Sequence, residues 1–199
     1  MSRQRVEVRR EEILRSTIAE IERSGMSSLR VADVASRLGV SSGLIFYHFD
    51  TRDCLLVSAL EFAVERDLTR LDKAVAKGSS AVERLRRVLA SYGPTGAAPG
   101  WTLWIDAWAT ALREPNIRDA LRRLDDRWRQ ALEHVITEGA RANDFACADP
   151  VATVARIGAL LDGLSVAVLV YRSVSRGQLR TWVREAAAAE LGIDAAMLA

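Results

Sequence analysis

Apolar residues recur at helical spacing along this chain, and that pattern limits its possible folds more than any other feature. In the stretch that begins at Trp101, apolar residues follow at i+3, i+4, i+7 and i+11, which places them on one helix face. The same periodicity returns along the sequence, whereas strand-like alternation does not. The pattern predicts an all-α protein of about nine helices. The residues of this example are Trp101, Trp104, Ile105, Trp108 and Leu112.

Start and stop signals divide the periodic sequence into segments. Gly25 and Gly39 follow the first two periodic stretches, and "GPTGAAPG" (93–100) is the clearest loop. Thr51 fits an N-cap, and Pro115 fits the first turn of a helix. The sequence therefore predicts helices over about 8–24, 31–38, 42–48, 51–76, 82–92, 101–112, 115–138 and 151–171, with a last one from about 179 onward.

The composition fits a folded protein of one large domain or two smaller ones. Of 199 residues, 49% are apolar, so a substantial core can be buried. The net charge of +2 is too small to indicate a polyanion-binding protein by itself, and the preference for Arg over Lys fits genomic composition as well as function. Cys54 and Cys147 match neither a disulfide framework nor a metal site, and no cofactor is expected.

Two segments bear on the location of the protein. The start of the chain, "MSRQRVEVRREEILR", is charged and lacks the apolar segment of a signal peptide. The most apolar stretch, 154–171, contains Arg156 and Asp162, and its longest charge-free run is shorter than the roughly 20 residues that span a membrane. The sequence predicts a cytoplasmic protein.

A tight turn separates the second and third predicted helices, in "VADVASRLGVSSGLIFYHF" (31–49). Ala35 is small where two helices must cross closely, and Gly39 can adopt the positive φ that a sharp turn requires. The pattern is typical of a helix-turn-helix, whose second helix lies in the DNA major groove. An ordinary αα-corner would use the same types of residue. The apolar residues expected behind the turn are Val34, Leu38, Val40 and Ile45.

The aromatic run at the end of this stretch favours DNA binding over a plain corner. Ile45 and Phe49 lie four residues apart and form the expected inward pair. Phe46 and Tyr47 then turn outward, where no core needs a ring. Rings placed on the outer side of a short helix indicate a surface that meets a partner.

The outward positions suit different contacts with DNA. The small residues 42–43 let the helix approach base edges, and Leu44 can contact a thymine methyl. Tyr47, His48 and Arg52 can contact phosphates, which position a protein without specifying sequence. His48 also fits a capping or solvated surface histidine.

The segment "LRVADVASRLGVSSGLIFYHFDTRDCLL" resembles the DNA-binding part of the tetracycline-repressor (TetR) family, over about residues 9–60. The shared features are the helix-turn-helix, an aromatic-aromatic-His-Phe run, a basic residue and a Leu pair. More loosely, "GWTLWIDAWATALREPNIRDALRRLDDRWRQAL" and "ALLDGL" resemble the regulatory domain of choline-responsive betaine-operon repressors. The resemblance implies a DNA-binding domain over 1–50 and a helical regulatory and dimerisation domain over 51–199.

The chain departs from the family pattern at two places. Arg30, Val31 and Ala32 stand where the family often has Thr and a basic residue, so Arg30 is the candidate for that phosphate contact. Phe46 replaces the commoner Tyr and removes a hydroxyl. The predicted DNA-binding residues are Arg30, Ser41, Ser42, Gly43, Leu44, Phe46, Tyr47, His48 and Arg52.

The helix expected over 151–171 is apolar nearly all round. That suits a helix covered on one side by its own subunit and on the other by a second copy. Gly158 and Gly163 would permit close helix approach. A central helix in a monomer core would have the same sequence, and the family resemblance favours the homodimer, in which the last two helices form a four-helix bundle with the partner.

A cluster of tryptophans indicates where a small molecule could bind. Trp101, Trp104 and Trp108 share a helix face, and other aromatic residues could close a pocket around them. A bulky core is the alternative explanation. The resemblance to choline-responsive repressors implies a cation held by ring faces, with Asp162 as its counter-ion or as a hydrogen-bonding residue across the dimer. The predicted pocket residues are Phe62, Tyr92, Trp101, Trp104, Trp108, Trp128 and Asp162.

These features predict a ligand-responsive transcriptional regulator, a repressor that binds an inverted-repeat operator as a homodimer and is released by a small molecule. An enzyme is disfavoured because the chain has two histidines and no GxSxG, P-loop, dinucleotide or Cys–His motif. Catalysis would depend on carboxylates alone, and pairs such as Asp125 and Asp126 fit a solvent-facing helix side better. A helical protein that does not bind DNA is a further alternative. The sequence names neither the effector nor the operator, and it does not separate repression from activation.

Overall fold

A computed structural model describes residues 3–92 and 101–199, and these form nine α-helices and no strand, which confirms the all-α prediction. Two short helical turns accompany them: the π-helical turn η1 (Ala167–Tyr171) at the end of α8, and the 3-10 turn η2 (Ala195–Leu198) near the C-terminal end. The α-helices are α1 (Arg3–Ser24), α2 (Val31–Leu38), α3 (Ser42–Phe49), α4 (Arg52–Ala76), α5 (Ala81–Tyr92), α6 (Trp101–Ala111), α7 (Pro115–Arg141), α8 (Pro150–Val166) and α9 (Arg176–Leu191).

Most predicted boundaries agree with the structure to within a few residues. The first helix begins at Arg3 rather than near residue 8. The Thr51 hydroxyl accepts a hydrogen bond from the Cys54 amide at 3.1 Å, as the predicted N-cap requires. The expectation that Leu112 shares the buried face of α6 is wrong, because α6 ends at Ala111 and Leu112 is 75% exposed. The predicted loop 93–100 lies outside the described residues.

The chain forms two compact units. One contains Met1–Arg66 with Thr102–Arg123, and the other contains Asp67–Trp101 with Leu124–Ala199. Both units therefore draw on two separate stretches of chain. The two units are defined by which residues pack together and not by function. The domain boundary predicted at residue 50 therefore stays a prediction.

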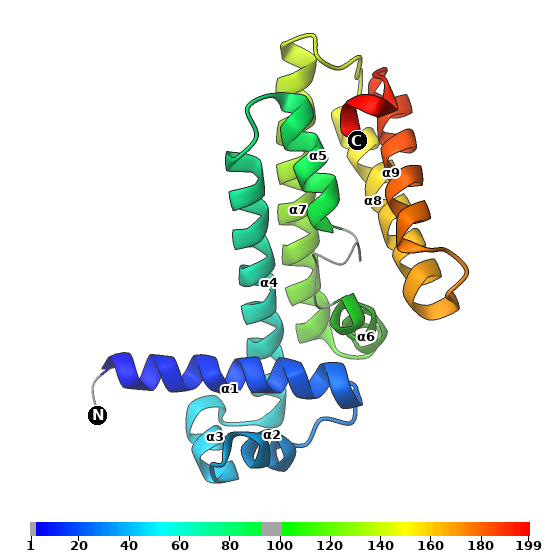
Figure 1. Ribbon diagram of the computed structural model, residues 1–199. Coiled ribbons are helices and arrows are strands. Elements are labelled where there is room, and N and C mark those ends of the chain that lie inside the picture. The colour runs from blue at the N-terminus through cyan, green and yellow to red at the C-terminus, as the bar shows by residue number, and fades with distance from the viewer. Residues whose placement is uncertain (1–2, 93–100) are drawn as a thin grey trace. The chain divides into compact units, whose positions relative to one another are not determined.

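In the first unit, α2 packs against α1 and α3 (Figure 1). The apolar residues of α1 form a buried stripe, and burial of such a stripe is the main source of helix stability in a protein. The fully buried side chains of this core include Ile13, Leu14, Met26, Ile45 and Leu55.

In the second unit, α8 lies beside α9, and η2 packs against α5 and α9 (Figure 1). Ser175 and Gln178 form a reciprocal capping box at the start of α9, which fits the predicted start of the last helix. The fully buried side chains of this core include Leu71, Leu85, Ile136, Ile157 and Leu161.

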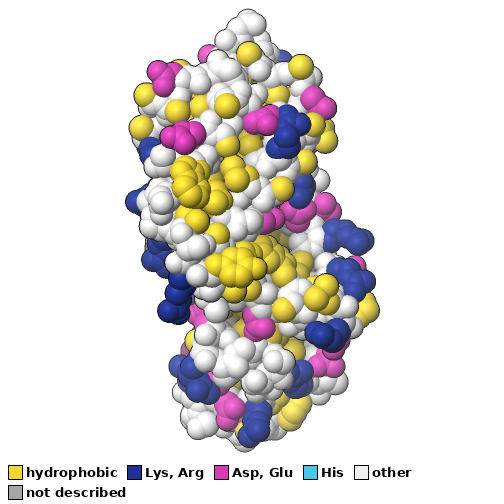
Figure 2. Space-filling model, turned by 90° about the vertical axis from the view of Figure 1, so that its right-hand side faces the viewer, with side chains coloured by type: hydrophobic (Ala, Val, Ile, Leu, Met, Phe, Trp, Pro, Cys, Tyr) yellow, Lys and Arg dark blue, Asp and Glu magenta, His cyan; other side chains and the backbone are white. Residues whose placement is uncertain are grey.

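The segment Pro150–Tyr171 consists of α8 and η1. It forms one continuous apolar helical stretch, longer than the charge-free run on which the sequence argument depended. Its 22 residues and mean hydropathy of 1.8 would suffice for a membrane span on length and composition alone, a test that core helices of soluble proteins also pass. Only 28% of the tested window is buried within the chain. Much of this apolar helix therefore lies on the surface of a single subunit, and Figure 2 shows hydrophobic side chains gathered on the side of the molecule where α8 and α9 lie.

Candidate DNA-binding and ligand-binding sites

The turn between α2 and α3 is fixed by backbone geometry and by one hydroxyl. Gly39 adopts φ 65°, ψ 34°, the left-handed conformation that ends α2, and the Val40 amide donates to the Ala35 carbonyl at 3.0 Å. Ser41 then caps α3, because its Oγ accepts from the Leu44 amide at 3.3 Å. Ser41, predicted to contact DNA, thus holds the start of the recognition helix, and its hydroxyl can still donate.

The third helix divides its aromatic residues between core and surface as the spacing predicts. Ile45 and Phe49 are buried, whereas Phe46 is 43% and Tyr47 75% exposed. The Tyr47 and His48 rings meet edge to face at 5.4 Å between centroids. From the inner side, the Arg10 guanidinium lies 4.9 Å from the centroid of the Phe49 ring. The outer face of α3 therefore presents rings that the core does not use.

The smaller predicted contact residues lie on the same surface. Ser42 and Leu44 are half-buried and Gly43 is exposed, so the backbone of the first turn of α3 is accessible. Arg30 is exposed at the N-cap of α2, where its side chain makes no capping hydrogen bond. These positions are those of a surface that can meet DNA, and the contacts themselves stay predictions.

Arg52 has a structural role that the sequence did not indicate. Its Nε donates to the Leu29 carbonyl at 2.9 Å, and its Nη2 donates to the carbonyls of Met26 at 3.0 Å and Ser27 at 3.2 Å. The side chain at the start of α4 thus holds the segment that joins α1 to α2. From the other side, the Asp106 carboxylate accepts a hydrogen bond from the Met26 amide. The predicted phosphate contact of Arg52 would have to share a guanidinium that is already engaged.

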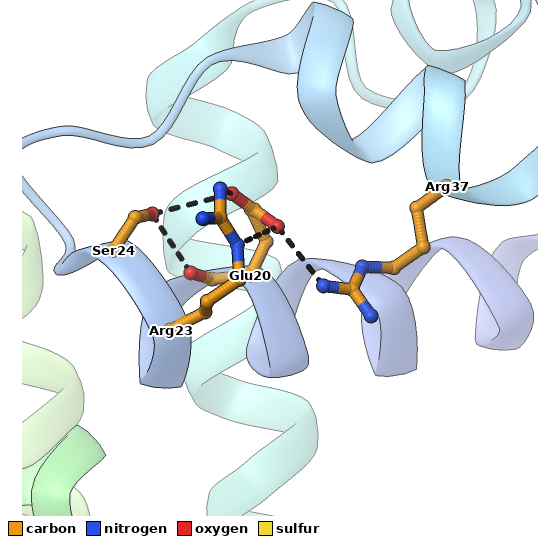
Figure 3. A network of polar contacts seen from close by, with 4 residues as sticks. All are labelled: Glu20, Arg23, Ser24 and Arg37. Atoms are coloured by element: carbon orange, nitrogen blue, oxygen red, sulfur yellow. Dashed lines mark hydrogen bonds and ion pairs between the residues drawn. The ribbon is translucent and has the colours of Figure 1, made fainter.

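A buried carboxylate ties α2 to α1 (Figure 3). The Glu20 side chain is only 3% exposed and forms ion pairs with Arg23 and with Arg37, whose Nη2 lies 3.2 Å from Oε2. The Ser24 hydroxyl donates to the same residue. The hydrogen bonds from Arg23, followed by those from Arg37, outweigh the opposing effect of burial and lower the pKa of Glu20 to about 2. Sequence reasoning missed this network because "EIERS" reads as an ordinary charged helix face.

Three predicted pocket residues come together in the second unit. The Tyr92 ring meets Trp128 edge to face at 4.8 Å and Trp101 at 5.8 Å between centroids. The Trp101 indole Nε1 donates to the Tyr92 carbonyl at 2.7 Å, which satisfies the polar atom of a buried ring. Tyr92 therefore lies at the centre of the aromatic cluster, with its hydroxyl directed to α8.

Two carboxylates and one guanidinium accompany these rings. The Tyr92 hydroxyl donates to Asp162 Oδ1 at 2.8 Å, and Arg129 Nε lies 2.6 Å from Asp125 Oδ2. Burial raises the pKa of Asp162, and the nearby Asp125 adds to the rise, while the Tyr92 hydrogen bond and Arg129 oppose it. Burial, and then the Asp162 charge, also raise the pKa of Tyr92. With both acids ionised, the cluster carries one net negative charge.

Asp125 and Arg129 are the residues that sequence reasoning missed here. The sequence places Asp125 on a solvent-facing position with Asp126, but Asp125 is half-buried and lines the same cavity as Tyr92 and Trp128. The available signal was its spacing, since Asp125 and Arg129 lie one helical turn apart on either side of Trp128. Asp125 therefore keeps the predicted exposure in part, with 44% of its side chain exposed, but it also lines a cavity that the sequence did not indicate.

The remaining predicted pocket residues fall in the first unit. Trp104 is buried, Trp108 is half-buried, and Phe62 lies beneath the Arg66 guanidinium at 5.7 Å from its ring centroid. Their part in the ligand site stays a prediction. The cavity around Tyr92 and Trp128 encloses about 20 Å³, room for one water molecule, so the aromatic cluster is packed nearly shut.

Comparison with known proteins identifies both halves of the chain. Residues 13–59 match the family described as bacterial regulatory proteins, tetR family, and residues 81–192 match the BetI-type transcriptional repressor C-terminal domain. The chain belongs to the TetR family. The HTH-type transcriptional regulator BetI of Paraburkholderia phymatum is 29% identical over 163 residues, which cover 79% of this chain and 80% of that protein.

Two solved structures of TetR-type regulators agree with this assignment. A transcriptional regulator from Saccharomonospora viridis, solved in complex with choline, is 30% identical with a TM-score of 0.83 and covers 90% of this chain and 95% of its own. A TetR-family regulator from Rhodococcus sp. is 30% identical with a TM-score of 0.78 and covers 92% and 98%. TetR-family proteins are DNA-binding transcriptional regulators rather than enzymes, and they bind operator DNA and small effectors and act as dimers.

Proposed function

We propose that this TetR-family protein is a cytoplasmic repressor that leaves its operator when a small organic cation of the choline type binds the cluster of Tyr92, Trp101, Trp128 and Asp162. The observation that carries this proposal is the charge of the cluster: two carboxylates, Asp125 and Asp162, face a single guanidinium, Arg129. A cation would neutralise the charge that remains. The choline bound to the Saccharomonospora regulator supports the same class of ligand.

The aromatic rings support a quaternary ammonium in particular. Such an ion has no hydrogen to donate, so it is recognised by ring faces, and each such contact contributes about 0.5–2 kcal/mol depending on its desolvation. The rings of Tyr92, Trp101 and Trp128 lie together with the half-buried carboxylate of Asp162. This set of groups would discriminate against neutral molecules of the same shape.

The nearly closed cavity supports coupling of ligand binding to a change in conformation. About 20 Å³ cannot hold choline, so Tyr92 or Arg129 must move before the ligand enters. A ligand shifts a conformational equilibrium only if it binds one state better than the other. A ligand that fits only the opened cluster meets that requirement.

At the other functional surface, two α3 helices of a homodimer would read the two halves of an inverted repeat. The exposed Phe46 and Tyr47 and the accessible first turn of α3 support contacts with base edges and phosphates. Exposed Val151, Val170, Tyr171 and Trp182 support an interface formed by α8 and α9, because they add to an apolar surface that a partner subunit would cover.

The test uses the full-length protein and labelled DNA from upstream of its own gene. Choline and its neutral isostere 3,3-dimethylbutan-1-ol are titrated while DNA release is followed by fluorescence polarisation. We expect release by choline alone. Acidification should weaken the choline effect, because Asp162 takes up a proton as the pH falls through its raised pKa.

A pair of variants assigns the effect to the cluster. Asp162→Asn keeps an acceptor for the Tyr92 hydroxyl but removes the charge, so it should weaken choline about tenfold or more without changing DNA affinity. Asp126→Asn on the exposed side of α7 is the matched control. Equal release by the neutral isostere, or an unchanged response of Asp162→Asn, would place the effector site elsewhere.

A further inference from the structure

A second cavity in the regulatory unit has a different chemistry from the aromatic cluster. It lies between α5, α8, α9 and η2 and encloses about 170 Å³. Its floor is apolar and includes Leu89, Leu161 and Leu179, all buried. Three arginines, Arg86, Arg180 and Arg184, stand among its lining residues, and none of the described side chains that line it is acidic, although the main-chain carboxylate of Ala199 also lies at the cavity.

The arginines at this cavity form few hydrogen bonds or ion pairs within the described part of the chain. Arg180 and Arg184 make no hydrogen bond or ion pair with any residue that the structure describes. Arg86 Nη2 is 3.9 Å from Glu83 Oε1, an oxygen that already binds Arg87 at 2.5 Å. Like charges one helical turn apart, as at 180 and 184, destabilise a helix unless an anion lies between them. The guanidinium groups of Arg180 and Arg184 are thus the two at the cavity that no described acidic side chain pairs.

We infer that this cavity is a second ligand site, which takes a small amphipathic carboxylate with its apolar tail on the leucine floor and its carboxylate at the arginines. The size agrees with such a ligand, since a leucine-lined cavity of about 150 Å³ accepts benzene. About 170 Å³ therefore admits an apolar group of roughly six carbon atoms. Guanidinium forks match the geometry of a carboxylate and bind it with two parallel hydrogen bonds.

The site is separate from the apolar surface of α9. Trp182, which is 41% exposed, is two residues from both Arg180 and Arg184. At 3.6 residues per turn, that spacing places Trp182 about 160° around the helix from each of them. A subunit that covered Trp182 would therefore leave the arginine side of α9 open. The second site shares the apolar residues Leu89 and Leu161 with the cavity beside Tyr92, but its polar groups differ, because it uses neither the aromatic rings nor Asp162.

Hexanoate is the probe that tests the site, with hexan-1-ol and hexylammonium as neutral and cationic controls of equal length. Calorimetric titration of the full-length protein should show binding of hexanoate alone. Arg180→Gln combined with Arg184→Gln should weaken hexanoate by about tenfold or more, since each charge-assisted hydrogen bond is worth at least that factor. Both changes keep a long side chain that is compatible with the helix.

Two controls decide whether the site is the one inferred. Arg176→Gln removes a charge from the exposed first turn of α9, one turn before Arg180, at a residue that does not line the cavity, and should change hexanoate affinity far less than the double variant. Asp162→Asn should also leave it unchanged, which separates this site from the choline-type site. No binding of hexanoate at millimolar concentration, equal binding of hexan-1-ol, or equal losses in the Arg176 variant and the double variant would overturn the inference.

Discussion

The recognition helix and the aromatic cluster differ in whether their aromatic rings are exposed or enclosed. In α3, Phe46 and Tyr47 stand out from the surface, although Phe49 beside them is buried. In the cluster, Trp101 and Trp128 are buried, and the polar atoms of Trp101 and Tyr92 have hydrogen-bond partners. Exposed rings with no role in the core mark a surface for a large partner, whereas enclosed rings with polar groups beside them mark a place for a small one.

Charge separates the two regions as well. Around Glu20, one carboxylate meets two guanidinium groups, and its oxygens are satisfied within the protein. Around Tyr92, two carboxylates meet one guanidinium, and burial raises the pKa of Asp162. The first arrangement holds helices in place, while the second favours the arrival of a cation. The balance of charge thus distinguishes the structural network around Glu20 from the ligand site that we propose around Tyr92.

The largest effect on stability should come from removing the buried ring of α3, compared with removing an exposed ring of the same helix. Phe49→Ala removes a buried ring and should lower the free energy of unfolding by about 3–5 kcal/mol. Phe46→Ala, three residues away but exposed, should change it by less than about 1 kcal/mol and yet weaken operator binding. Urea denaturation and gel-shift titration measure the two effects. Equal destabilisation by both variants would show that Phe46 belongs to the core after all.

In the cluster, Tyr92→Phe should have the next largest effect. The variant leaves the Asp162 carboxylate without its donor, which costs about 1–3 kcal/mol of unfolding free energy. It should also raise the pKa of Asp162 further, because the lost hydrogen bond lowers that pKa. The deficit should therefore shrink as the pH falls through the raised pKa of Asp162, because protonation removes the unpaired charge. Tyr47→Phe, which removes an exposed hydroxyl on α3, is the control for stability, and an equal loss there would disprove the special role of Tyr92.

A smaller effect distinguishes a positioning arginine from a phosphate-binding one. Arg52→Ala loses hydrogen bonds to three carbonyls and should lower the stability of the DNA-binding region by about 1 kcal/mol, with little change in the salt dependence of binding. Arg30→Ala should leave stability unchanged and reduce the logarithmic salt slope by about 1. Operator binding across a salt series separates the two. A reduced slope for Arg52→Ala as well would mean that its guanidinium reaches DNA.

The smallest effect appears only in acid. Because the pKa of Glu20 is lowered from 4.5 to about 2, its contribution to stability is complete above pH 4.5 and is lost as the pH falls toward 2. Glu20→Gln should flatten this part of the pH profile of unfolding. Glu22→Gln, on the exposed side of α1, is the matched control. If the pH profile of unfolding in acid were the same in Glu20→Gln as in the parent protein, Glu20 would not be the cause of the acid-dependent loss of stability.

Periodicity in the sequence predicted the helices and their buried sides, but not the side chains that reach across the fold. Helical spacing located the nine helices of the described residues, and the four-residue interval between Ile45 and Phe49 identified the inward side of α3. Spacing within a helix could not show that Arg52 bonds to carbonyls more than 20 residues earlier, nor that Glu20 meets Arg37. Those contacts depend on how helices pack against one another.

The aromatic cluster around Tyr92 was predictable in part for the same reason. Tyr92, Trp101 and Trp128 are large and aromatic, and such residues are expected in a common core. Asp125 looked like a surface charge because its partner Arg129 and its neighbour Asp126 are also charged. Leu112 looked buried because periodicity continues past the last residue of α6. A pattern of residues shows which face of a helix is apolar, but it does not show where the helix ends or what covers it.

The hydrogen bond from Trp101 to the Tyr92 carbonyl has a consequence for the speed of assembly during folding. These two residues are nine positions apart, whereas Tyr92 and Asp162 are 70 apart. Chain segments of about ten residues close within about 10–100 ns, and the entropic cost of closure rises with the length of the segment. The Tyr92–Trp101 pair therefore forms among the early contacts of the chain, before α7 and α8 bring Trp128 and Asp162 to it.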